Sequence, residues 1–597
     1  MNDNTYSRFD ILFRLIMKKI TIIISLFFQF AIGQNFTKTW ATYYGDESVV
    51  VKDSEIDSMG NVYIVGKVQY NPLGAYVIAT FDAHQTNFGG GEADGFITKF
   101  NSDGDVIWST YYGGENLDRI DDISIDKYNN IYCIGGTFST QNIAGINSYQ
   151  PNLAGNSDTF IVKLSPIGEV LWNTYFGGSG NETGIELNEY NSGNSIVNDE
   201  LGNFYFFSQT DSTFLSTTGV FQENRNDAKS IIAKFSDDGN RIWCTYYGIN
   251  NSKIKSIDIG QTGIFVAGLA IDCAPFTPNT YFATSNCHQS SAGSCLDTFI
   301  SKFNFDGQRI WSTYYGGTSA ERLNSNGLKC NNGFIYFSGL GTSNLNITTP
   351  NSFQPTKIST TYSNYLVKLN EAGERIWGTY VGENSTAGIT EPISAKIKIH
   401  LSDIYLYGAT VLTENISTPN SFQPNINENY DGYLVKFNEN GSREWGSYFG
   451  ANNVDEVKNI LFKNDSFYLI GKTLSQTGMA TTGVLQPNFL YNNGPWEALT
   501  IANTFVAKFD PNLLAVQAPS DSNFSVFPNP NNGVFSINSN YSNTFTLEIY
   551  NFLGQIIHSQ NIKSNDLIVA KSLTPGIYFV KIKSGNNVYS ETKIIIQ

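Results

Sequence analysis

The stretch that decides the fold is FITKFNSDGDVIWSTYYGG, residues 96–114. An apolar strand ending in Lys99 is followed by the turn Asn-Ser-Asp-Gly and by a second strand that carries Trp108. Gly104 stands where a short loop needs a positive φ, so we expect the two strands to be antiparallel neighbours. The segment is therefore predicted to be a β-hairpin.

This hairpin recurs along the chain. The first marker is the pattern Trp-x-Thr/Ser-Tyr-x-Gly. It occurs in seven copies, 64 to 71 residues apart, at Trp40, Trp108, Trp172, Trp243, Trp311, Trp377 and Trp445. An apolar strand ending in Lys is the second marker, at Lys99, Lys163, Lys234, Lys302, Lys368, Lys436 and Lys508. A fixed period of this length indicates a repeat architecture.

Each unit also contains two further strands around a tight turn, such as 122–126 and 131–135. Four short strands cannot bury both faces of a sheet alone, and stacking the units around a ring solves this better than a string of separate small sandwiches does. We therefore predict an all-β chain whose residues 34–517 form a seven-bladed β-propeller.

The two ends of the repeat array complete each other. Trp40 has no Lys strand before it, and the last Lys strand, 505–509, has neither the turn Gly nor a Trp after it. We expect the strand of Trp40 to be the outermost strand of the last blade, because open sheet edges would otherwise remain on both sides of the gap.

Long loops precede the Lys strands and are the expected binding face. Each loop carries a Gln, at Gln85, Gln150, Gln222, Gln289, Gln354, Gln423 and Gln486. The seventh loop is the longest and contains Trp496, the one Trp outside the repeat register. Trp496 is the candidate ligand contact, and the alternative is that it only roofs the loop.

Acidic residues stand five positions after the first Gly of the following loop in four repeats, at Asp118, Glu182, Glu321 and Asp455. A rim of carboxylates could hold calcium, the one cofactor considered. The alternative is that these carboxylates accept hydrogen bonds from backbone N–H groups of their own Gly loops.

Three of the six cysteines, Cys273, Cys287 and Cys295, fall in one short stretch. A disulfide from Cys287 to Cys295, or from Cys273 to Cys287, would staple that loop. There is no CxxC pair and no histidine at zinc spacing, which disfavours a metal site.

The formal charge of −16 and the pI near 4.8 exclude nucleic acid as a partner, since they repel phosphate. The four histidines offer no visible base and nucleophile pair, so no catalytic residue is assigned. A carboxylate-based enzyme stays open, because carboxylate pairs have no long-range sequence signature.

The N-terminus reads as a secretory signal peptide over residues 1–33. Lys18 and Lys19 precede a short apolar run that ends in Ala31-Ile32-Gly33, and Met17 is the expected true start. The run is too short for a membrane anchor, and no later segment is predicted to cross a bilayer.

The repeat pattern ends before a polar linker at 518–523, and a different pattern of strands and turns follows it. Residues 524–597 contain alternating runs separated by Asn-Pro-Asn-Asn-Gly and Pro-Gly turns, which predicts a small Ig-like β-sandwich. An accessory carbohydrate-binding sandwich is the alternative interpretation.

Two resemblances add to this. The segments FITKFNSDGDVIW and VIWSTYYGG resemble the seven-bladed propeller repeats (SBBP type) of secreted bacterial proteins, and the hairpin also resembles the Asp-box turn of sialidases. A sialidase needs a central arginine cluster, whereas Arg241, Arg309, Arg375 and Arg443 stand two residues before the repeat Trp. The repeat resemblance implies a fold and no activity.

The second resemblance covers the C-terminal unit. VFPNPNNGVFSI, LEIYNFLGQII, LTPGIYFVKI and ETKIIIQ resemble the type A C-terminal sorting domain of the type IX secretion system of Bacteroidetes. The matching positions are Pro528, Asn529, Pro530, Gly533, Gly554, Gly576 and Tyr578. The resemblance implies recognition by the type IX machinery and delivery outside the cell or to its outer surface.

Together these features predict a monomeric, secreted or cell-surface protein that binds a glycan or protein without catalysis. The alternative is a polysaccharide-acting hydrolase or lyase with a carboxylate site over the central channel.

Overall fold

The computed structural model describes residues 36–71, 77–182, 194–271, 280–357, 362–382, 395–412, 415–419, 421–427, 430–490, 502–511, 524–529, 531–539, 544–551, 555–571, 573–584 and 587–596. All the regular secondary structure in these ranges is β-strand. The chain divides into two compact units, residues 1–511 and 512–597.

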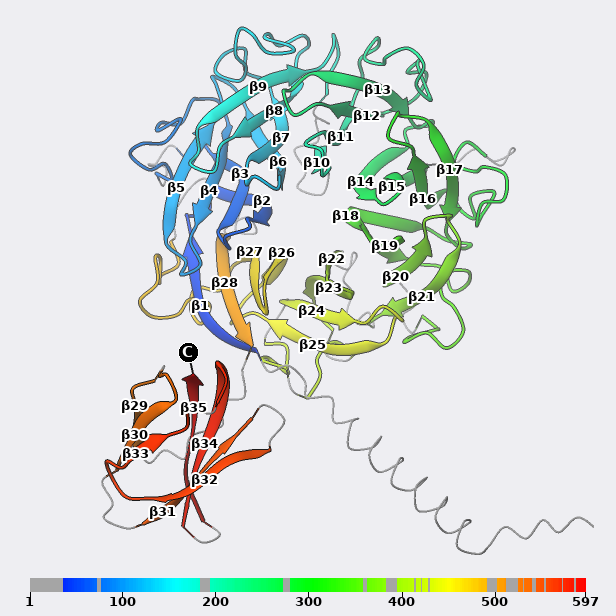
Figure 1. Cartoon of the computed structure of the whole chain (residues 1–597). Helices are drawn as coiled ribbons and strands as arrows, with labels where there is room; N and C mark the ends of the chain where they lie inside the picture. The colour runs from blue at the N-terminus through cyan, green and yellow to red at the C-terminus, as the bar shows by residue number, and fades with distance from the viewer. Residues whose placement is uncertain are drawn as a thin grey trace, which may run out of the picture. The chain divides into compact units, whose positions relative to one another are not determined.

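The first unit contains seven four-stranded antiparallel sheets within its described residues. Figure 1 shows them arranged around a common centre. The innermost strands are β2 (Val49–Ile56), β6 (Asp118–Ile125), β10 (Asn194–Asn198), β14 (Lys253–Gly260), β18 (Glu321–Asn331), β22 (Lys396–His400) and β26 (Asp455–Lys463). The second strands are β3 (Val62–Gln69), β7 (Ile131–Thr137), β11 (Phe204–Gln209), β15 (Gly263–Ile271), β19 (Phe334–Gly341), β23 (Asp403–Thr410) and β27 (Ser466–Thr473).

The outer half of each sheet is the predicted hairpin. The third strands, which carry the repeat Lys, are β4 (Ala93–Phe100), β8 (Asp158–Leu164), β12 (Ser230–Phe235), β16 (Leu296–Phe303), β20 (Ser363–Asn370), β24 (Asp431–Phe437) and β28 (Asn503–Pro511). The outermost strands, which carry the repeat Trp, are β5 (Val106–Tyr112), β9 (Val170–Phe176), β13 (Arg241–Tyr247), β17 (Arg309–Tyr315), β21 (Arg375–Val381), β25 (Arg443–Phe449) and β1 (Phe36–Tyr44).

One sheet combines the two ends of the array. β1 pairs antiparallel with β28, from Phe36 opposite Pro511 to Tyr44 opposite Thr504. The Thr39 hydroxyl also donates to the Asp510 carboxylate at 2.6 Å. This pairing is the one that the unmatched strands predicted, and it leaves β28 with a neighbour on both sides.

The hydrophobic core lies between the sheets. Each of the seven clusters in this unit combines buried side chains from two neighbouring sheets. Tyr112 of β5 and Phe160 of β8, for example, stack with ring centroids 5.2 Å apart and are fully buried. Since fully burying a large apolar side chain stabilises by roughly 1.5 to 3 kcal/mol, the sheets depend on their neighbours for stability.

The repeat Trp links each sheet to the next. The indole N–H of Trp108 donates to the carbonyl of Pro166, in the turn of the next hairpin, at 3.2 Å, and Lys99 donates to the same oxygen at 2.9 Å. The turn Gly168 has φ +89°, and a Cβ there would lie 3.1 Å from the Trp108 ring. Gly is therefore required both by the turn and by the indole packed against it.

The same double contact recurs at other sheet boundaries. Trp and Lys share the carbonyl of Phe305 (Trp243, Lys234), of Glu371 (Trp311, Lys302) and of Glu439 (Trp377, Lys368). The sequence repeat is thus a repeat of the contacts between sheets.

Trp445 is the exception. The next sheet along is the one that combines β1 with β28. These two strands come from opposite ends of the array, so no hairpin turn joins them and offers a carbonyl to the indole. The buried Trp445 indole N–H has no hydrogen-bond partner among the described residues, and Phe36 packs edge-on against the ring with centroids 5.8 Å apart.

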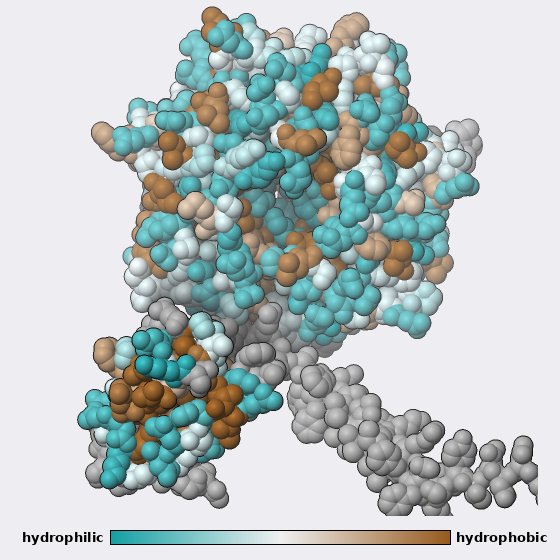
Figure 2. Space-filling model, in the orientation of Figure 1, coloured by the Kyte–Doolittle hydropathy of each residue, from teal (hydrophilic) through white to brown (hydrophobic). Residues whose placement is uncertain are grey.

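The second unit consists of two packed sheets. One has the order β29 (Phe524–Phe527), β30 (Val534–Ser539), β33 (Leu567–Val569), and the other has β32 (Ile556–Ile562), β31 (Phe545–Tyr550), β34 (Gly576–Ser584), β35 (Asn587–Ile596). Their facing side chains form one core, which includes Phe535, Leu547 and Val580. Apolar side chains gather on its surface in Figure 2. Exposed apolar residues of this unit include Ile556, Leu567, Ile577 and Phe579.

Candidate binding pocket at the centre of the ring

The four carboxylates predicted to form a rim are buried in their own loops. Asp118, Glu182, Glu321 and Asp455 are fully buried, and each accepts a hydrogen bond from the backbone N–H four residues earlier, at 2.6 to 2.9 Å. The described residues contain no group of three or more His, Cys, Asp or Glu side chains arranged to hold a metal ion. Calcium at this rim stays a prediction.

A second carboxylate accompanies each of these four, and the sequence reasoning missed it. Asp94 and Asp118 both lie against Gly113, where a Cβ would come within 2.5 Å and 2.9 Å of their oxygens. Burial, together with the neighbouring Asp118 carboxylate, raises the pKa of Asp94 to about 7. The signal was present, since an Asp stands five residues before the repeat Lys at Asp94, Asp158, Asp297 and Asp431.

The Gln residues of the long loops hold their own sheets together. Gln85 accepts a hydrogen bond from Gly113 N–H at 3.0 Å, and Gln486 accepts one from Gly45 N–H at 3.0 Å. Trp496 lies outside the described residues. All seven Gln side chains are thus hydrogen-bonded within the fold, although Oε1 of the buried Gln354 has no partner among the described residues.

Both disulfides suggested by the sequence involve Cys287, and neither forms. Cys287 is a free cysteine, whereas Cys295 is disulfide-bonded. Cys273 lies outside the described residues. Proximity in sequence misled the prediction, because the spacing of cysteines in a loop does not fix which side chains face each other.

The sorting-domain positions lie at turns and strand ends. The Phe527–Pro528 bond is cis, the Asn529 side chain accepts the N–H of Ile595 at 2.8 Å, and Gly533 has φ +82°. Gly576 begins β34, and the Tyr578 hydroxyl donates to Thr574 O at 2.8 Å. Pro530 and Gly554 are outside the described residues.

A pocket of about 220 Å³ lies at the centre of the ring. All seven innermost strands contribute to its lining, which the sequence analysis did not identify. The lining residues are Asp53, Ser54, Glu55, Asp122, Ile123, Ser124, Ser195, Ile196, Val197, Asn198, Asp258, Asn326, Lys329, Lys396, Lys398, Tyr407 and Asn459. Most of them are polar or charged, so the pocket suits a hydrophilic ligand.

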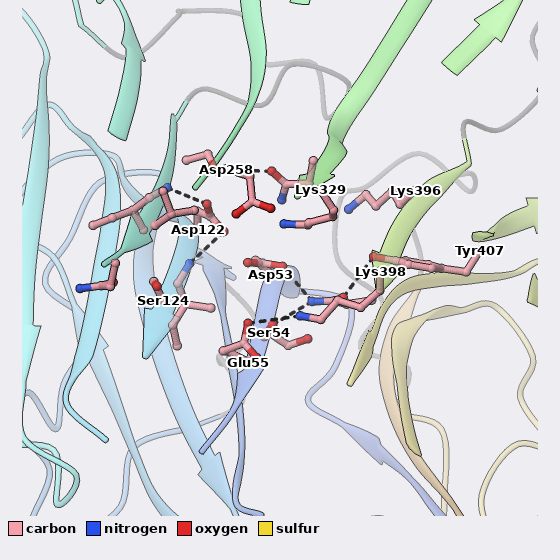
Figure 3. Close-up of a pocket in the computed structure, with 17 residues that line it drawn as sticks. Asp53, Ser54, Glu55, Asp122, Ser124, Asp258, Lys329, Lys396, Lys398 and Tyr407 are labelled. Carbon is pink, nitrogen blue, oxygen red and sulfur yellow. Dashed lines mark hydrogen bonds and ion pairs between the residues drawn. The ribbon is translucent and has the colours of Figure 1, made fainter. Parts of the chain in front are cut away.

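The charges of the pocket are segregated. Its carboxylates come from β2, β6 and β14, and its lysines come from β18 and β22. Figure 3 shows Asp258, Asp122 and Asp53 on one side, facing Lys329 and Lys396 on the other. The pocket therefore has an acidic wall and a basic wall.

Two carboxylates of the acidic wall, those of Asp53 and Asp122, are in hydrogen-bonding contact. Burial, the nearby Asp53 charge and a hydrogen bond between the two side chains raise the pKa of Asp122 well above its usual range. Asp122 also accepts the backbone N–H of Ile196 on the next innermost strand at 2.8 Å. It thus serves partly to satisfy an edge amide of that strand.

Asp53 is also held from its other side. The Tyr407 hydroxyl donates to Asn459 Oδ1 at 3.2 Å, and Asn459 Nδ2 donates to Asp53 Oδ1 at 3.0 Å. This chain of hydrogen bonds fixes the position of Asp53, so its carboxylate is held in place before any ligand arrives.

The lysines of the basic wall differ in their partners. Lys398 is paired with Glu55 at 3.3 Å. Burial lowers the pKa of Lys329, but the carboxylates of Asp258, Asp122, Asp53 and Glu55 outweigh this and raise it above the usual value. Lys329 nevertheless has no ion pair with any described residue, so its ammonium group is charged and uncommitted.

Lys396 donates to the carbonyl of Lys458 at 3.2 Å. Burial, with the neighbouring Lys458 charge, lowers the pKa of Lys396. Lys396, like Lys329, has no ion pair among the described residues, and these two lysines stand on adjacent innermost strands. A ligand with an anionic group could bridge them.

The C-terminal unit is the part of the chain with a clear match among known families. Residues 525–597 match the secretion system C-terminal sorting domain. The protein is exported to the cell surface or the extracellular space. Its sorting unit implies an interaction with the type IX secretion machinery, as its motifs predicted. The described residues contain no helix long and apolar enough to span a membrane.

Matches to the remainder are distant. An uncharacterized WD repeat-containing protein, L264, of Acanthamoeba polyphaga mimivirus is 22% identical over 448 residues, 69% of this chain, and the aligned part spans 28% of that relative's length. Polysaccharide lyase Uly1 (TM-score 0.37, 9% identity, 77% of this chain and 89% of the other) and phage phi92 endosialidase (TM-score 0.35, 10% identity, 94% and 87%) are similar structures. At these TM-scores they carry no argument about activity.

Proposed function

We propose that the protein is a secreted or cell-surface binding protein whose ligand site is the pocket at the centre of a seven-bladed β-propeller. The proposed arrangement is a signal peptide at 1–33, the propeller at 34–517, a linker at 518–523 and an Ig-like sorting sandwich at 524–597. The seven sheets around one centre support the propeller, and the repeat and sorting motifs support a source in the Bacteroidetes.

One observation carries the choice of site. The pocket brings charged side chains from separate innermost strands together, with Asp53 held by Asn459 and with Lys329 uncommitted. Polar groups that are positioned in advance bind a ligand without a cost in ordering them. The loop Gln residues show the opposite pattern, since they are hydrogen-bonded within their own sheets.

A thermal-shift screen tests the site. We expect at least one member of a panel of neutral, anionic, cationic and zwitterionic small molecules to raise the melting temperature of the full chain, because a ligand that binds the folded state stabilises it. The combined variant Asp258→Asn and Lys329→Met should abolish the shift, and Lys229→Met, which lies outside the pocket lining and pairs with Asp211 at 2.7 Å, should keep it. If the ligand still raises the melting temperature of the pocket variant, the binding site lies elsewhere on the protein.

A polysaccharide-acting enzyme is the second candidate, and the contact between the Asp53 and Asp122 carboxylates is the observation in its favour. Glycosidases hold their two carboxylates roughly 5 to 10 Å apart, so that sugar and water fit between them. Asp53 and Asp122 are in direct hydrogen-bonding contact, and Asp122 is engaged with Ile196 N–H. Binding without catalysis therefore fits this geometry better. Release of reducing ends or unsaturated products from a polysaccharide panel, lost in Asp122→Asn, would reverse that conclusion.

A further inference from the structure

The central pocket has two walls of opposite charge, and this separation carries information about its ligand. Glu55 and Lys398 form an ion pair at 3.3 Å, and the Asp122 carboxylate is hydrogen-bonded to Asp53 and to the backbone N–H of Ile196. The groups left to a ligand are Asp53 and Asp258 on the acidic wall and Lys329 and Lys396 on the basic wall.

Three of these four groups, Asp53, Asp258 and Lys396, are held in place by hydrogen bonds with uncharged partners. Asp258 accepts the backbone N–H of Cys330 at 2.7 Å, and Asp53 accepts the Asn459 amide. Lys396 donates to a carbonyl, which does not neutralise an ammonium group. In Figure 3 the carboxylates of Asp53 and Asp258 face the ammonium groups of Lys329 and Lys396 across the pocket.

Two neutral groups of the lining have no hydrogen-bond partner in the part of the chain that the structure describes. They are both polar atoms of the buried Asn198 side-chain amide and the Ser54 hydroxyl, which is 1% exposed. Buried polar groups without partners are uncommon in proteins and call for an explanation, and a bound polar ligand is one.

We propose that the pocket selects a small zwitterion, with its carboxylate between Lys329 and Lys396 and its ammonium group against Asp53 and Asp258. A dianion would place one negative charge against the acidic wall, and a diamine would place one positive charge against the basic wall. Either arrangement is repulsive at close range, where the low dielectric of the pocket strengthens it. This inference rests on the proposed function, because it specifies the ligand class of the same pocket.

The test uses four probes with the same four-carbon backbone on the full chain. Isothermal titration calorimetry with γ-aminobutyrate, succinate, putrescine and 1,4-butanediol compares a zwitterion, a dianion, a dication and a neutral molecule of matched length. We expect γ-aminobutyrate to bind at least about tenfold more tightly than each of the others. Lys329→Met and Asp258→Asn should each remove that preference, and Lys229→Met should keep it.

The outcomes separate this inference from the proposed function. Equal or tighter binding of succinate or putrescine, lost in the pocket variants, would overturn the zwitterion while leaving the central pocket as the binding site. No binding of γ-aminobutyrate at up to roughly 10 mM would also overturn it. If no molecule of the wider panel stabilises the chain through the pocket, the proposed function itself is wrong.

Discussion

At the scale of single residues, the repeat Trp stabilises the contact between neighbouring sheets rather than its own sheet. Its indole N–H reaches a carbonyl in the next hairpin turn, and the turn Gly makes room for the ring. Trp243 and Trp445 occupy equivalent positions and are both nearly buried, but only Trp243 has a hydrogen-bond partner among the described residues.

This pair gives an internally controlled prediction. Trp243→Phe should lower the free energy of unfolding by about 1 kcal/mol more than Trp445→Phe, since a hydrogen bond contributes roughly that amount and both variants lose the same volume. Urea denaturation of the two variants measures the difference. Equal losses would mean that the indole hydrogen bond contributes nothing.

The buried carboxylates predict the pH dependence of stability. The pKa of Asp94 is about 7 when folded, above its ordinary value of about 3.8, so the folded state binds the extra proton between these two values. The stability that this proton contributes is complete below about pH 4 and is lost as the pH rises through 7. We expect the slope of melting temperature against pH from 5 to 8 to be less negative in Asp94→Asn. The exposed turn variant Asp103→Asn should keep the wild-type slope, and an unchanged slope in Asp94→Asn would contradict the assignment.

The rim carboxylates allow a direct calorimetric test. If Asp118, Glu182, Glu321 and Asp455 hold calcium, titration should give saturable heat that disappears in the variant Asp118→Ala with Asp455→Ala. Absence of heat would leave these side chains as acceptors for the N–H groups of their own loops, the geometry observed here.

At the scale of elements, β1 is the piece on which the ring depends. It buries Ala41, Tyr43 and Tyr44, and β28 would become an open edge without it. We expect deletion of residues 34–45 to lower the melting temperature of the whole first unit by about 10 °C or more, because several kcal/mol of apolar burial are lost. Differential scanning calorimetry would show this as a shift of the main transition. An unchanged transition would mean that the closing sheet is not needed for the ring.

The sequence predicted the order of strands well but named none of the residues that line the pocket, and particular residues show why. Trp, Lys and Gly recur because every sheet boundary needs the same contact, so their period is visible. Asp53, Asp122 and Asn459 each follow a bulge in an innermost strand, where the extra residue redirects the side chain. This position is Asp in β2 and β6, Asn459 in β26 and Ser256 in β14, so no single residue recurs there in every repeat. No repeat signature could mark them.

At the scale of the whole molecule, the chain is a compact ring joined in sequence to a unit that has its own core. Truncation after Pro511 keeps β28 entire and removes only the sorting unit. We expect the truncated protein to keep the melting temperature of the ring and to accumulate in the periplasm. Cell fractionation with immunoblotting of full-length and truncated forms decides this. Equal amounts of both forms outside the cell would favour the accessory carbohydrate-binding sandwich instead.

The pairing of β1 with β28 also sets an order in time. Thr39 and Asp510 touch across 471 positions of the chain, so the ring cannot close until nearly all of its strands have been made. The sorting unit follows β28 in the chain and is made after it. A chain that carries the sorting unit therefore already contains every strand needed for closure. A chain whose synthesis stops before the sorting unit cannot be recognised for export.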